Sequence, residues 1–315
     1  MKKAVILESL GIPDEELAAL EAPFAGEVEF RSYPKTADVP TLIAQARDAD
    51  AVIIANMPMP GAVIEGCEKL SFIDVAFTGV DHVDLAAARA RGVKVSNASG
   101  YSDEAVAELV IGMALSVLRN IPQTQERVRA GGTKDGLVGC ELKGKTVGII
   151  GYGRIGRRTG ELLHAFGCHI LAQCLHRHDD LPDFVEQVSQ DELLRRADIV
   201  VLHCPLNDST RGMIDYAKLS LMKRSAILIN AARGPVTDED DLARALSEGV
   251  IAAAAVDVFT KEPPLPPDTQ MLRAPNTLLT PHIAFATRES MSLRAQIVFD
   301  NLRAWLDGGQ KNVIL

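Results

Sequence analysis

Aromatic side chains are scarce in this sequence, at 4% of 315 residues with a single tryptophan. The apolar fraction is nevertheless 47%, so aliphatic side chains must fill the interior. Both faces of a parallel β-sheet are covered by helices, and its buried strands are therefore runs of valine, isoleucine and leucine. The composition thus favours an α/β fold, and a chain of this length suits two domains.

Cysteines are few, odd in number and without any Cys-x-x-Cys motif (Cys67, Cys140, Cys168, Cys174 and Cys204). Disulfide frameworks and zinc sites normally use paired, closely spaced cysteines. We therefore expect reduced thiols, no metal site and a cytoplasmic location.

Long apolar runs and basic stretches are also missing. No run approaches the ~20 apolar residues that a membrane-spanning helix requires. The formal net charge is −9, whereas binding to a nucleic-acid backbone needs a positive surface. The N-terminal MKKAVIL is followed at once by acidic residues, and it resembles a first strand more than a signal peptide. We expect neither a membrane nor a nucleic-acid partner.

Strand-like and helix-like segments alternate in two series. The first has helical stretches at 38–48 and 84–91 and strand-like runs at 3–8, 50–55, 71–76 and 92–96. A helix that is apolar nearly all round, at 105–118, separates it from a second series with runs at 145–150, 169–173, 198–203, 226–230, 251–257 and 277–280. An amphipathic helix at 287–307 follows. This alternation predicts two doubly wound parallel-sheet α/β domains, of Rossmann or flavodoxin type.

A glycine motif opens the second series. Gly151, Gly153 and Gly156 form the pattern Gly-x-Gly-x-x-Gly directly after the run KTVGII and at the start of a helix. In this context the first glycine allows a tight turn, the second lets the backbone approach a pyrophosphate, and the third permits close helix packing. Free N–H groups of the helix N-terminus, around Arg154 and Ile155, would face the phosphates. The motif predicts a dinucleotide cofactor.

The acidic residue that normally follows this motif is absent. An NAD site usually has Asp or Glu at the end of the second strand, where it binds the ribose 2′-hydroxyl. Here that position is Cys174, and His176 and Arg177 follow. A carboxylate would repel a 2′-phosphate, whereas Arg177 can pair with one. We predict NAD(H) or NADP(H), with a slight preference for NADP(H); the alternative is that these are solvated loop residues and that NADH is used.

Three polar residues each follow a run of the second series: Arg233, Glu262 and His282. Ligands of doubly wound folds bind at the carboxyl ends of the strands, so these residues are expected to share a crevice with the cofactor. Each alone could be an ordinary surface residue. Their common placement after strands of one sheet indicates a catalytic set. His282 suits proton transfer within that set, because imidazole side chains exchange protons near neutral pH.

These segments resemble the D-isomer-specific 2-hydroxyacid dehydrogenases from about residue 50 to 308. The likeness rests on ordered motifs: FTGVDHVDL (77–85), RGVKVSN (91–97), VAELV (106–110), GKTVGIIGYGRIG (144–156), LHCPLNDSTRGMI (202–214), LMKRSAILINAARGPV (221–236), AVDVFTKEP (255–263) and TPHIAFATRES (280–290). PHIAFAT and FTGVDHVDL are most similar to the glycerate dehydrogenase/hydroxypyruvate reductase branch, with Phe285 where a tryptophan is usual.

The resemblance implies roles for individual residues. His282 would exchange the proton with the 2-oxo group, Glu262 would bind the other ring nitrogen, and Arg233 would hold the substrate carboxylate. On the substrate domain, the contacts would come from backbone N–H groups of Thr78, Gly79 and Val80 and from Asn56 and Met57. Asp257 would meet the nicotinamide, and further cofactor contacts would come from Val106, Cys204, Pro205, Thr210, Ala231 and Ala232.

The resemblance also implies a discontinuous domain organisation. A cofactor domain at 99–288 would be inserted into a substrate domain formed by residues 1–98 and 289–315. Family members are usually homodimers that associate through the long helix and the following loop. The apolar segment 105–118 suits such a contact, although packing between domains would explain it too.

The implied substrate is a small 2-oxo or D-2-hydroxy acid, of the glyoxylate or hydroxypyruvate kind. Met57 occupies a position where this branch often has a lysine, and methionine cannot bind a phosphate. We therefore expect a small neutral or apolar 2-substituent; the alternative is that Met57 and Met59 are simply packed against the loop.

Two other functions are compatible with this fold. Formate dehydrogenases carry glutamine in place of the acid partner of the histidine, so Glu262 argues against them. Corepressors use the fold as a cofactor-sensing binding module and can keep the three polar residues, but no segment here resembles their added tails. An enzyme would lose turnover on substitution of His282, whereas a binding module would keep its partner affinity.

Overall fold

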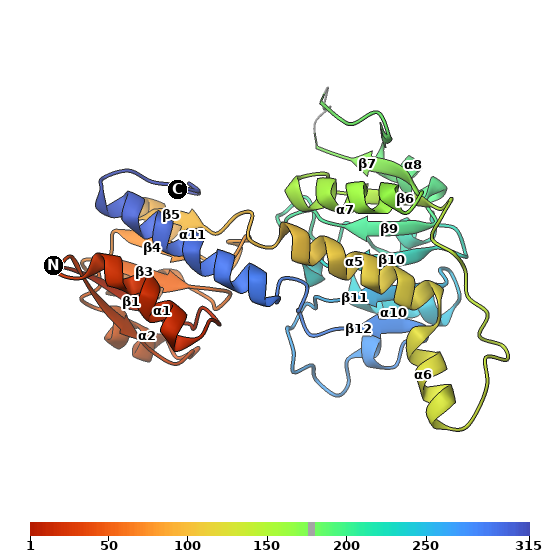
Figure 1. The fold of residues 1–315 in the computed structure, drawn as a ribbon, viewed down its shortest axis with the longest axis horizontal. Coiled ribbons are helices and arrows are strands. Elements are labelled where there is room, and N and C mark those ends of the chain that lie inside the picture. The colour runs from red at the N-terminus through yellow and green to blue at the C-terminus, as the bar shows by residue number, and fades with distance from the viewer. Residues whose placement is uncertain (176–179) are drawn as a thin grey trace. The chain divides into compact units, whose positions relative to one another are not determined.

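The computed structural model describes residues 1–175 and 180–315, which divide into two compact units (Figure 1). One unit consists of residues 1–102 and 286–315, and the other of residues 103–285. The second unit is thus an insertion in the first. His176 and Arg177, predicted to lie near a 2′-phosphate, fall outside the described residues.

The first unit is built on a five-stranded parallel sheet in the order β2-β1-β3-β4-β5, the flavodoxin-like order. Its strands are β1 (Lys2–Ile6), β2 (Val28–Ser32), β3 (Ala51–Ile54), β4 (Phe72–Val75) and β5 (Lys94–Asn97). Its helices are α1 (Asp14–Glu21), the 3₁₀ turn η1 (Ala22–Phe24), α2 (Val39–Ala46), α3 (Gly61–Gly66), α4 (Leu85–Ala90) and α11 (Arg288–Leu306). Strand β2 was not predicted from the sequence, because it lies at the sheet edge and only Val28 is buried.

The second unit has a seven-stranded parallel sheet in the order β12-β11-β10-β9-β6-β7-β8. Its strands are β6 (Thr146–Ile150), β7 (His169–Gln173), β8 (Val185–Gln187), β9 (Ile199–Leu202), β10 (Ile227–Asn230), β11 (Ala253–Val256) and β12 (Thr277–Leu279). Its helices are α5 (Asp103–Leu118), α6 (Ile121–Arg129), α7 (Arg154–Ala165), α8 (Gln190–Arg196), α9 (Tyr216–Leu219), α10 (Glu239–Ser247) and the 3₁₀ turns η2 (Gly234–Val236) and η3 (Gln270–Leu272).

The strand order of the second unit places a topological switch point between β6 and β9, because the chain builds the sheet in opposite directions from β6. Dinucleotides bind at such points in Rossmann folds. The predicted class, two doubly wound parallel-sheet domains, is confirmed. Strand β8 was missed because its three residues have no fully buried position.

Aliphatic side chains form the interior of both units, as the composition predicts. Every residue of β3 and β4 in the first unit, and of β9, β10 and β11 in the second, is buried. Helix α5 packs against α7 and against the strands β10 to β12. Its apolar surface is therefore used at least in part within its own unit.

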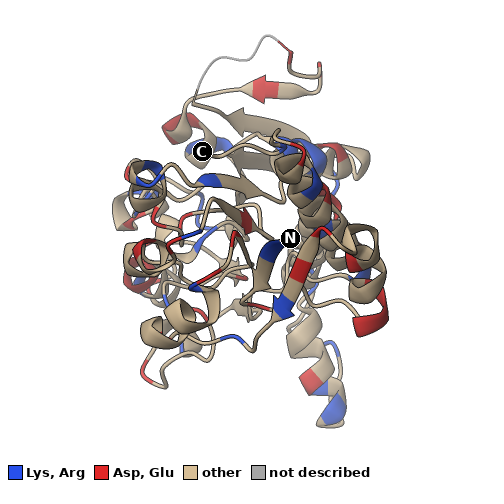
Figure 2. Cartoon of the chain, turned by 90° about the vertical axis from the view of Figure 1, so that its left-hand side faces the viewer, with Lys and Arg blue, Asp and Glu red and all other residues tan. Residues whose placement is uncertain are grey.

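The surface carries charges of both signs. Lys and Arg are interspersed with Asp and Glu along the elements drawn in Figure 2. In the described part of the chain, no single helix is long and apolar enough to cross a membrane; α5 and α6, bent by 57° at their junction, meet the length and composition limits only together. Within the same residues, no group of three or more His, Cys, Asp or Glu side chains is arranged to hold a metal ion.

Candidate active site

His282 and Glu262 lie in contact at one edge of the second unit's sheet. Strand β11 pairs in parallel with both β10 and β12, so the segments that follow these strands leave the sheet at the same edge. His282 Nδ1 is 3.1 Å from Glu262 Oε1, and the imidazole is 14% exposed. Two of the three predicted catalytic residues are thus brought together, with ring atom Nε2 directed away from the carboxylate.

Asp257 holds the backbone on which His282 lies. His282 adopts a φ of 55°, a left-handed conformation that costs a non-glycine residue about 1–3 kcal/mol. The fully buried Asp257 carboxylate accepts hydrogen bonds from the N–H groups of Ile283 and Ala284, each at 2.9 Å, and from the Thr280 hydroxyl. Sequence reasoning assigned Asp257 to the nicotinamide and missed this structural role.

Arg233 is carried by a turn that Asn230 fixes. The Asn230 side chain is buried at the end of β10. Its amide oxygen accepts a hydrogen bond from the Ala232 N–H at 3.1 Å, and its amide nitrogen donates to the Arg233 carbonyl at 3.1 Å. The turn then packs tightly, since a Cβ on Gly234 would lie 2.0 Å from the carbonyl carbon of Phe259. The Arg233 segment and the segment leading to Glu262 are therefore in contact.

The glycine loop lies at the switch point. Gly151 follows β6 with a φ of +95°, and a Cβ there would lie 2.5 Å from the Cys204 backbone nitrogen. A Cβ on Gly156 would lie 2.3 Å from the Gly151 carbonyl oxygen, whereas one on Gly153 would meet no atom within 4 Å. Gly153 is also the N-cap residue of helix α7, so no side chain at this position accepts a hydrogen bond from the first N–H groups of the helix. Open space beside uncapped N–H groups fits the pyrophosphate of a dinucleotide.

The remaining predicted cofactor residues lie on segments around this loop. Arg154 begins α7, and its side chain donates to Asp103 Oδ2 at 2.8 Å, which leaves its backbone, and that of Ile155, for the phosphates. The loop after β9 is closed by Thr210, whose hydroxyl donates to the Pro205 carbonyl at 2.7 Å. Val106, Cys204 and Ala232 are buried, and Ala231 is half-buried.

Cys174 occupies the end of β7, where an acidic residue was expected, and it is half-buried. Burial raises the pKa of its thiol, although the Tyr152 backbone N–H and the nearby Arg157 guanidinium oppose that shift. Arg157 comes from α7 and lies 2.9 Å from the Asp180 carboxylate. Arg157, which directly follows Gly156 of the glycine motif, is thus a cation near Cys174 that the sequence analysis did not assign.

The predicted substrate residues of the first unit follow two neighbouring strands. Asn56 and Met57 come after β3, and Thr78 comes after β4; the two strands pair in parallel. The Asn97 amide donates to the Thr78 carbonyl at 2.7 Å and so holds the segment that also contains Gly79 and Val80. Met57 has no exposed side-chain surface. The prediction that its side chain forms a substrate wall is corrected: it packs in the interior, and Asn56 is the more exposed neighbour.

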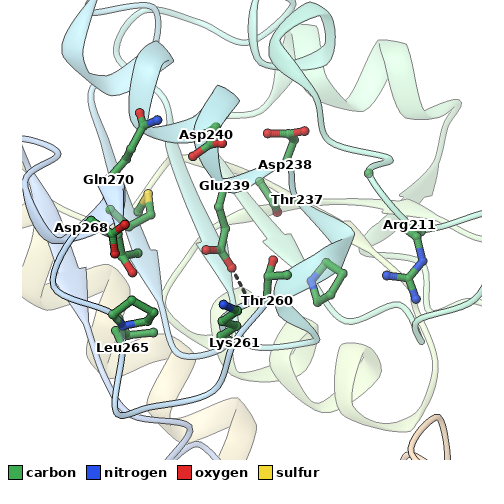
Figure 3. Close-up of a pocket in the computed structure, with 15 residues that line it drawn as sticks. Arg211, Thr237, Asp238, Glu239, Asp240, Thr260, Lys261, Leu265, Asp268 and Gln270 are labelled. Carbon is green, nitrogen blue, oxygen red and sulfur yellow. Dashed lines mark hydrogen bonds between the residues drawn. The ribbon is translucent and has the colours of Figure 1, made fainter.

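A pocket of about 600 Å³ opens beside the segment that leads to Glu262 (Figure 3). The Glu239 carboxylate points across it and accepts a hydrogen bond from the Thr260 N–H. Lys261 also lines the pocket, whereas Arg233 and His282 do not. The pocket therefore lies next to the catalytic set and does not include it.

Comparisons with known proteins agree with this geometry. Residues 111–284 match the NAD-binding domain of the D-isomer specific 2-hydroxyacid dehydrogenases. The chain is 34% identical to a hydroxypyruvate reductase of Blautia hydrogenotrophica, over 99% of both chains, and 37% identical to a glyoxylate reductase of Thermofilum pendens, over 89% of this chain and 84% of that one. The structure of an Aquifex aeolicus D-lactate dehydrogenase complexed with NAD and lactic acid superposes with a TM-score of 0.87 at 27% identity, covering 98% of this chain and 96% of that chain.

A glycine loop at a switch point and a His–Glu pair at neighbouring strand ends indicate hydride transfer involving a nicotinamide cofactor. The matched family and the similarity over nearly the full length identify the same chemistry. The protein is an oxidoreductase that uses a nicotinamide cofactor, and it belongs to the D-isomer-specific 2-hydroxyacid dehydrogenase family.

Proposed function

We propose that the protein reduces small 2-oxo acids, of the glyoxylate and hydroxypyruvate kind, to D-2-hydroxy acids. The observation that carries the proposal is the 3.1 Å His282–Glu262 pair, set in the unit that contains the dinucleotide loop. The names of the two curated relatives, a hydroxypyruvate reductase and a glyoxylate reductase, support the same substrate class.

His282 exchanges the substrate proton in this proposal. Its Nδ1 faces Glu262, so Nε2 donates a proton to the 2-oxo oxygen during reduction and accepts it back during oxidation. Glu262 fixes the ring orientation and stabilises the imidazolium. The bound nicotinamide supplies the hydride.

Arg233 binds the substrate carboxylate in this proposal. A guanidinium binds a carboxylate through two parallel N–H donors, which fixes both position and orientation. Within the first unit, the proposed carboxylate contacts are the backbone N–H groups of Thr78, Gly79 and Val80. We accordingly assign substrate binding to residues 1–98 and 289–315, and cofactor binding to residues 99–288.

A substrate panel tests this function. Cofactor oxidation is followed with glyoxylate, hydroxypyruvate, pyruvate and a bulkier 2-oxo acid, each with NADH and with NADPH. We expect turnover of the small acids. A protein that binds NADH or NADPH but turns over none of these acids would contradict the proposal and favour a cofactor-sensing binding module.

The residues around the ribose position favour NADPH over NADH. Cys174 removes the carboxylate that would repel a 2′-phosphate, and Arg157, which pairs with Asp180 in this structure, supplies a cation nearby. In Cys174→Asp we expect the ratio of kcat/KM for NADPH to that for NADH to fall by up to about fivefold, because an exposed charge interaction is worth about 0.2–1 kcal/mol. A large NADH preference in the unchanged protein would overturn this assignment.

A second copy of the chain is the partner that we propose for α6 and the loop after it. Helix α6 has no buried residue, and Ile121, Val128 and Val138 are 50%, 70% and 83% exposed. A contiguous patch of exposed apolar side chains is typical of an interface, and the proposal is that these three form one with a second copy. Sedimentation should show a dimer that Val128→Glu dissociates, and a monomer at micromolar concentration would contradict the proposal.

A further inference from the structure

Two side chains that sequence analysis left unassigned, Glu8 and Lys35, form a cluster with Asn56 in the first unit. Glu8 follows β1, Asn56 follows β3, and Lys35 lies between β2 and α2. Lys35 Nζ donates to Glu8 Oε1 at 2.6 Å and to Asn56 Oδ1 at 2.8 Å. Lys35 thus lies next to Asn56. The following residue, Met57, occupies the position where the similar branch of the family often has a lysine.

Glu8 anchors this cluster from the interior. It is 8% exposed, and its Oε2 accepts hydrogen bonds from the backbone N–H groups of Ala55 and Met57, each at 2.9 Å. Burial raises the pKa of Glu8, but Lys35 and these two N–H groups lower it by more, so the net shift is downward. The ionised carboxylate therefore fixes both the Lys35 ammonium and the backbone around Asn56.

The cluster has hydrogen-bond donors in excess. A lysine ammonium has three N–H donors and an asparagine amide has two. Two of the Lys35 donors are used, and within the described residues neither its third donor nor the Asn56 amide nitrogen has a protein acceptor. The Lys35 side chain is 53% exposed, and Asn56 is half-buried. These donors are therefore open to a ligand.

The cluster lies next to the proposed carboxylate site. The Ala76 N–H donates to the Ile54 carbonyl at 2.6 Å, so the segment with Asn56 and the segment with Thr78 begin side by side at the carboxyl ends of β3 and β4. In the binding mode that follows from this placement, a substrate whose carboxylate lies at 78–80 directs its C3 substituent toward the end of β3.

We propose that Lys35 and Asn56 form a specificity site for an oxygen atom on C3 of the 2-oxo acid. This inference rests on the proposed reductase function and adds the substrate subclass. A C3 hydroxyl oxygen accepts from the open donors, whereas a methyl group leaves them unpaired and desolvated. Because Glu8 balances the charge of Lys35, the site suits a neutral hydroxyl better than a phosphate dianion.

The test compares three substrates that differ at C3: hydroxypyruvate has a hydroxyl group there, pyruvate has only hydrogen, and glyoxylate lacks the carbon. The variant is Lys35→Met, which removes the donors and keeps most of the side-chain volume. The matched control is Lys2→Met, because Lys2 is 51% exposed and pairs with Asp50 at 2.7 Å, at the opposite end of β1. Lys35→Arg tests whether another donor restores the effect.

We expect the unchanged protein to have a kcat/KM about tenfold or more higher for hydroxypyruvate than for pyruvate. In Lys35→Met this ratio should fall to within about threefold, with little change for glyoxylate, and Lys35→Arg should recover part of it. A parallel loss for all three substrates would show that Lys35 only supports the loop, and this would overturn the inference. Equal rates with hydroxypyruvate and pyruvate in the unchanged protein would also overturn it.

Failure of the underlying function gives a different result, namely no turnover of any of the three acids by the unchanged protein. Should Lys35→Met fail to fold, Lys35→Leu supplies the same comparison because leucine also lacks donors, and thermal stabilisation by D-glycerate against D-lactate gives a readout that needs no turnover. Equal stabilisation of the unchanged protein by the two products would contradict the proposal.

Discussion

The backbone N–H of His282 donates to the carbonyl oxygen of Asp257 at 2.7 Å, and this bond holds the proposed proton donor at a φ of 55°. The Asp257 carboxylate binds the next two N–H groups, at Ile283 and Ala284. One acidic residue at the end of β11 therefore sets the position of the segment that follows β12.

Asp257→Asn should lower kcat without unfolding the protein. An amide has only one acceptor oxygen, so one of the two N–H bonds is lost and the His282 segment shifts. A misplacement of about 1 Å at a catalytic group costs about a hundredfold in rate. Steady-state kinetics measure the effect, with Asp268→Asn in the nearby pocket as the control. An Asp257→Asn rate within about threefold of the unchanged protein would show that the carboxylate does not position His282.

Gly234→Ala should destabilise the second unit and reduce activity together. The new methyl group would meet the Phe259 and Thr260 backbone at 2.0–2.4 Å, and a backbone contact this close cannot be relieved by a side-chain rotation. Overpacking of this kind costs about 1–3 kcal/mol. Chemical denaturation gives the free energy of unfolding; an unchanged midpoint would mean that the Arg233 and Glu262 segments are not in tight contact.

Gly153→Ala should fold normally and bind the cofactor more weakly. No atom lies within 4 Å of the added methyl group, but that group occupies the space proposed for the pyrophosphate. We expect the cofactor Kd to rise about tenfold or more, as measured by fluorescence titration. Gly112→Ala is the matched control, since it also meets nothing within 4 Å and lies in α5. An equal Kd in the two variants would place the pyrophosphate elsewhere.

His203 should make stability depend on pH in the acid range. Burial lowers the pKa of His203 from 6.5 to about 4, so the unfolded chain binds a proton in this interval that the folded chain does not. This contribution to stability is therefore complete above pH 6.5 and is lost as the pH falls from 6.5 to about 4.

His203→Gln should reduce the slope of unfolding free energy against pH between 4 and 6.5, by at most ~1.4 kcal/mol per pH unit. Denaturant titrations at several pH values measure this slope. The exposed His169 provides the control, as His169→Gln. Identical slopes for the unchanged protein and His203→Gln would show that His203 is protonated equally in the folded and unfolded chain.

Sequence patterns revealed most of the fold because buried parallel strands are compact aliphatic runs. All strands with fully buried residues throughout, such as β3 and β10, were found. The two missed strands, β2 and β8, lie at sheet edges, and only Val28 of β2 is buried in either strand. Edge strands pack on fewer neighbours, so their sequences carry a weaker signal.

The site was less predictable because several contacts join residues far apart in the chain. The sequence motifs indicated Glu262 and His282, which the structure places in contact. The roles of Asn230 and Asp257 in holding backbone turns depend on hydrogen bonds that no spacing reveals. Lys35 pairs with Glu8 across 27 positions, and for that reason a cation near Asn56 was not foreseen.

Single-turnover reduction of hydroxypyruvate by His282→Ala shows whether His282 exchanges the substrate proton. Cofactor affinity is measured on the same samples to show that the second unit is intact. We predict that the single-turnover rate falls about 10²–10⁴-fold while the cofactor Kd stays within about threefold of its original value. A variant that retains more than about a tenth of the rate would show that His282 is not the residue that exchanges the proton.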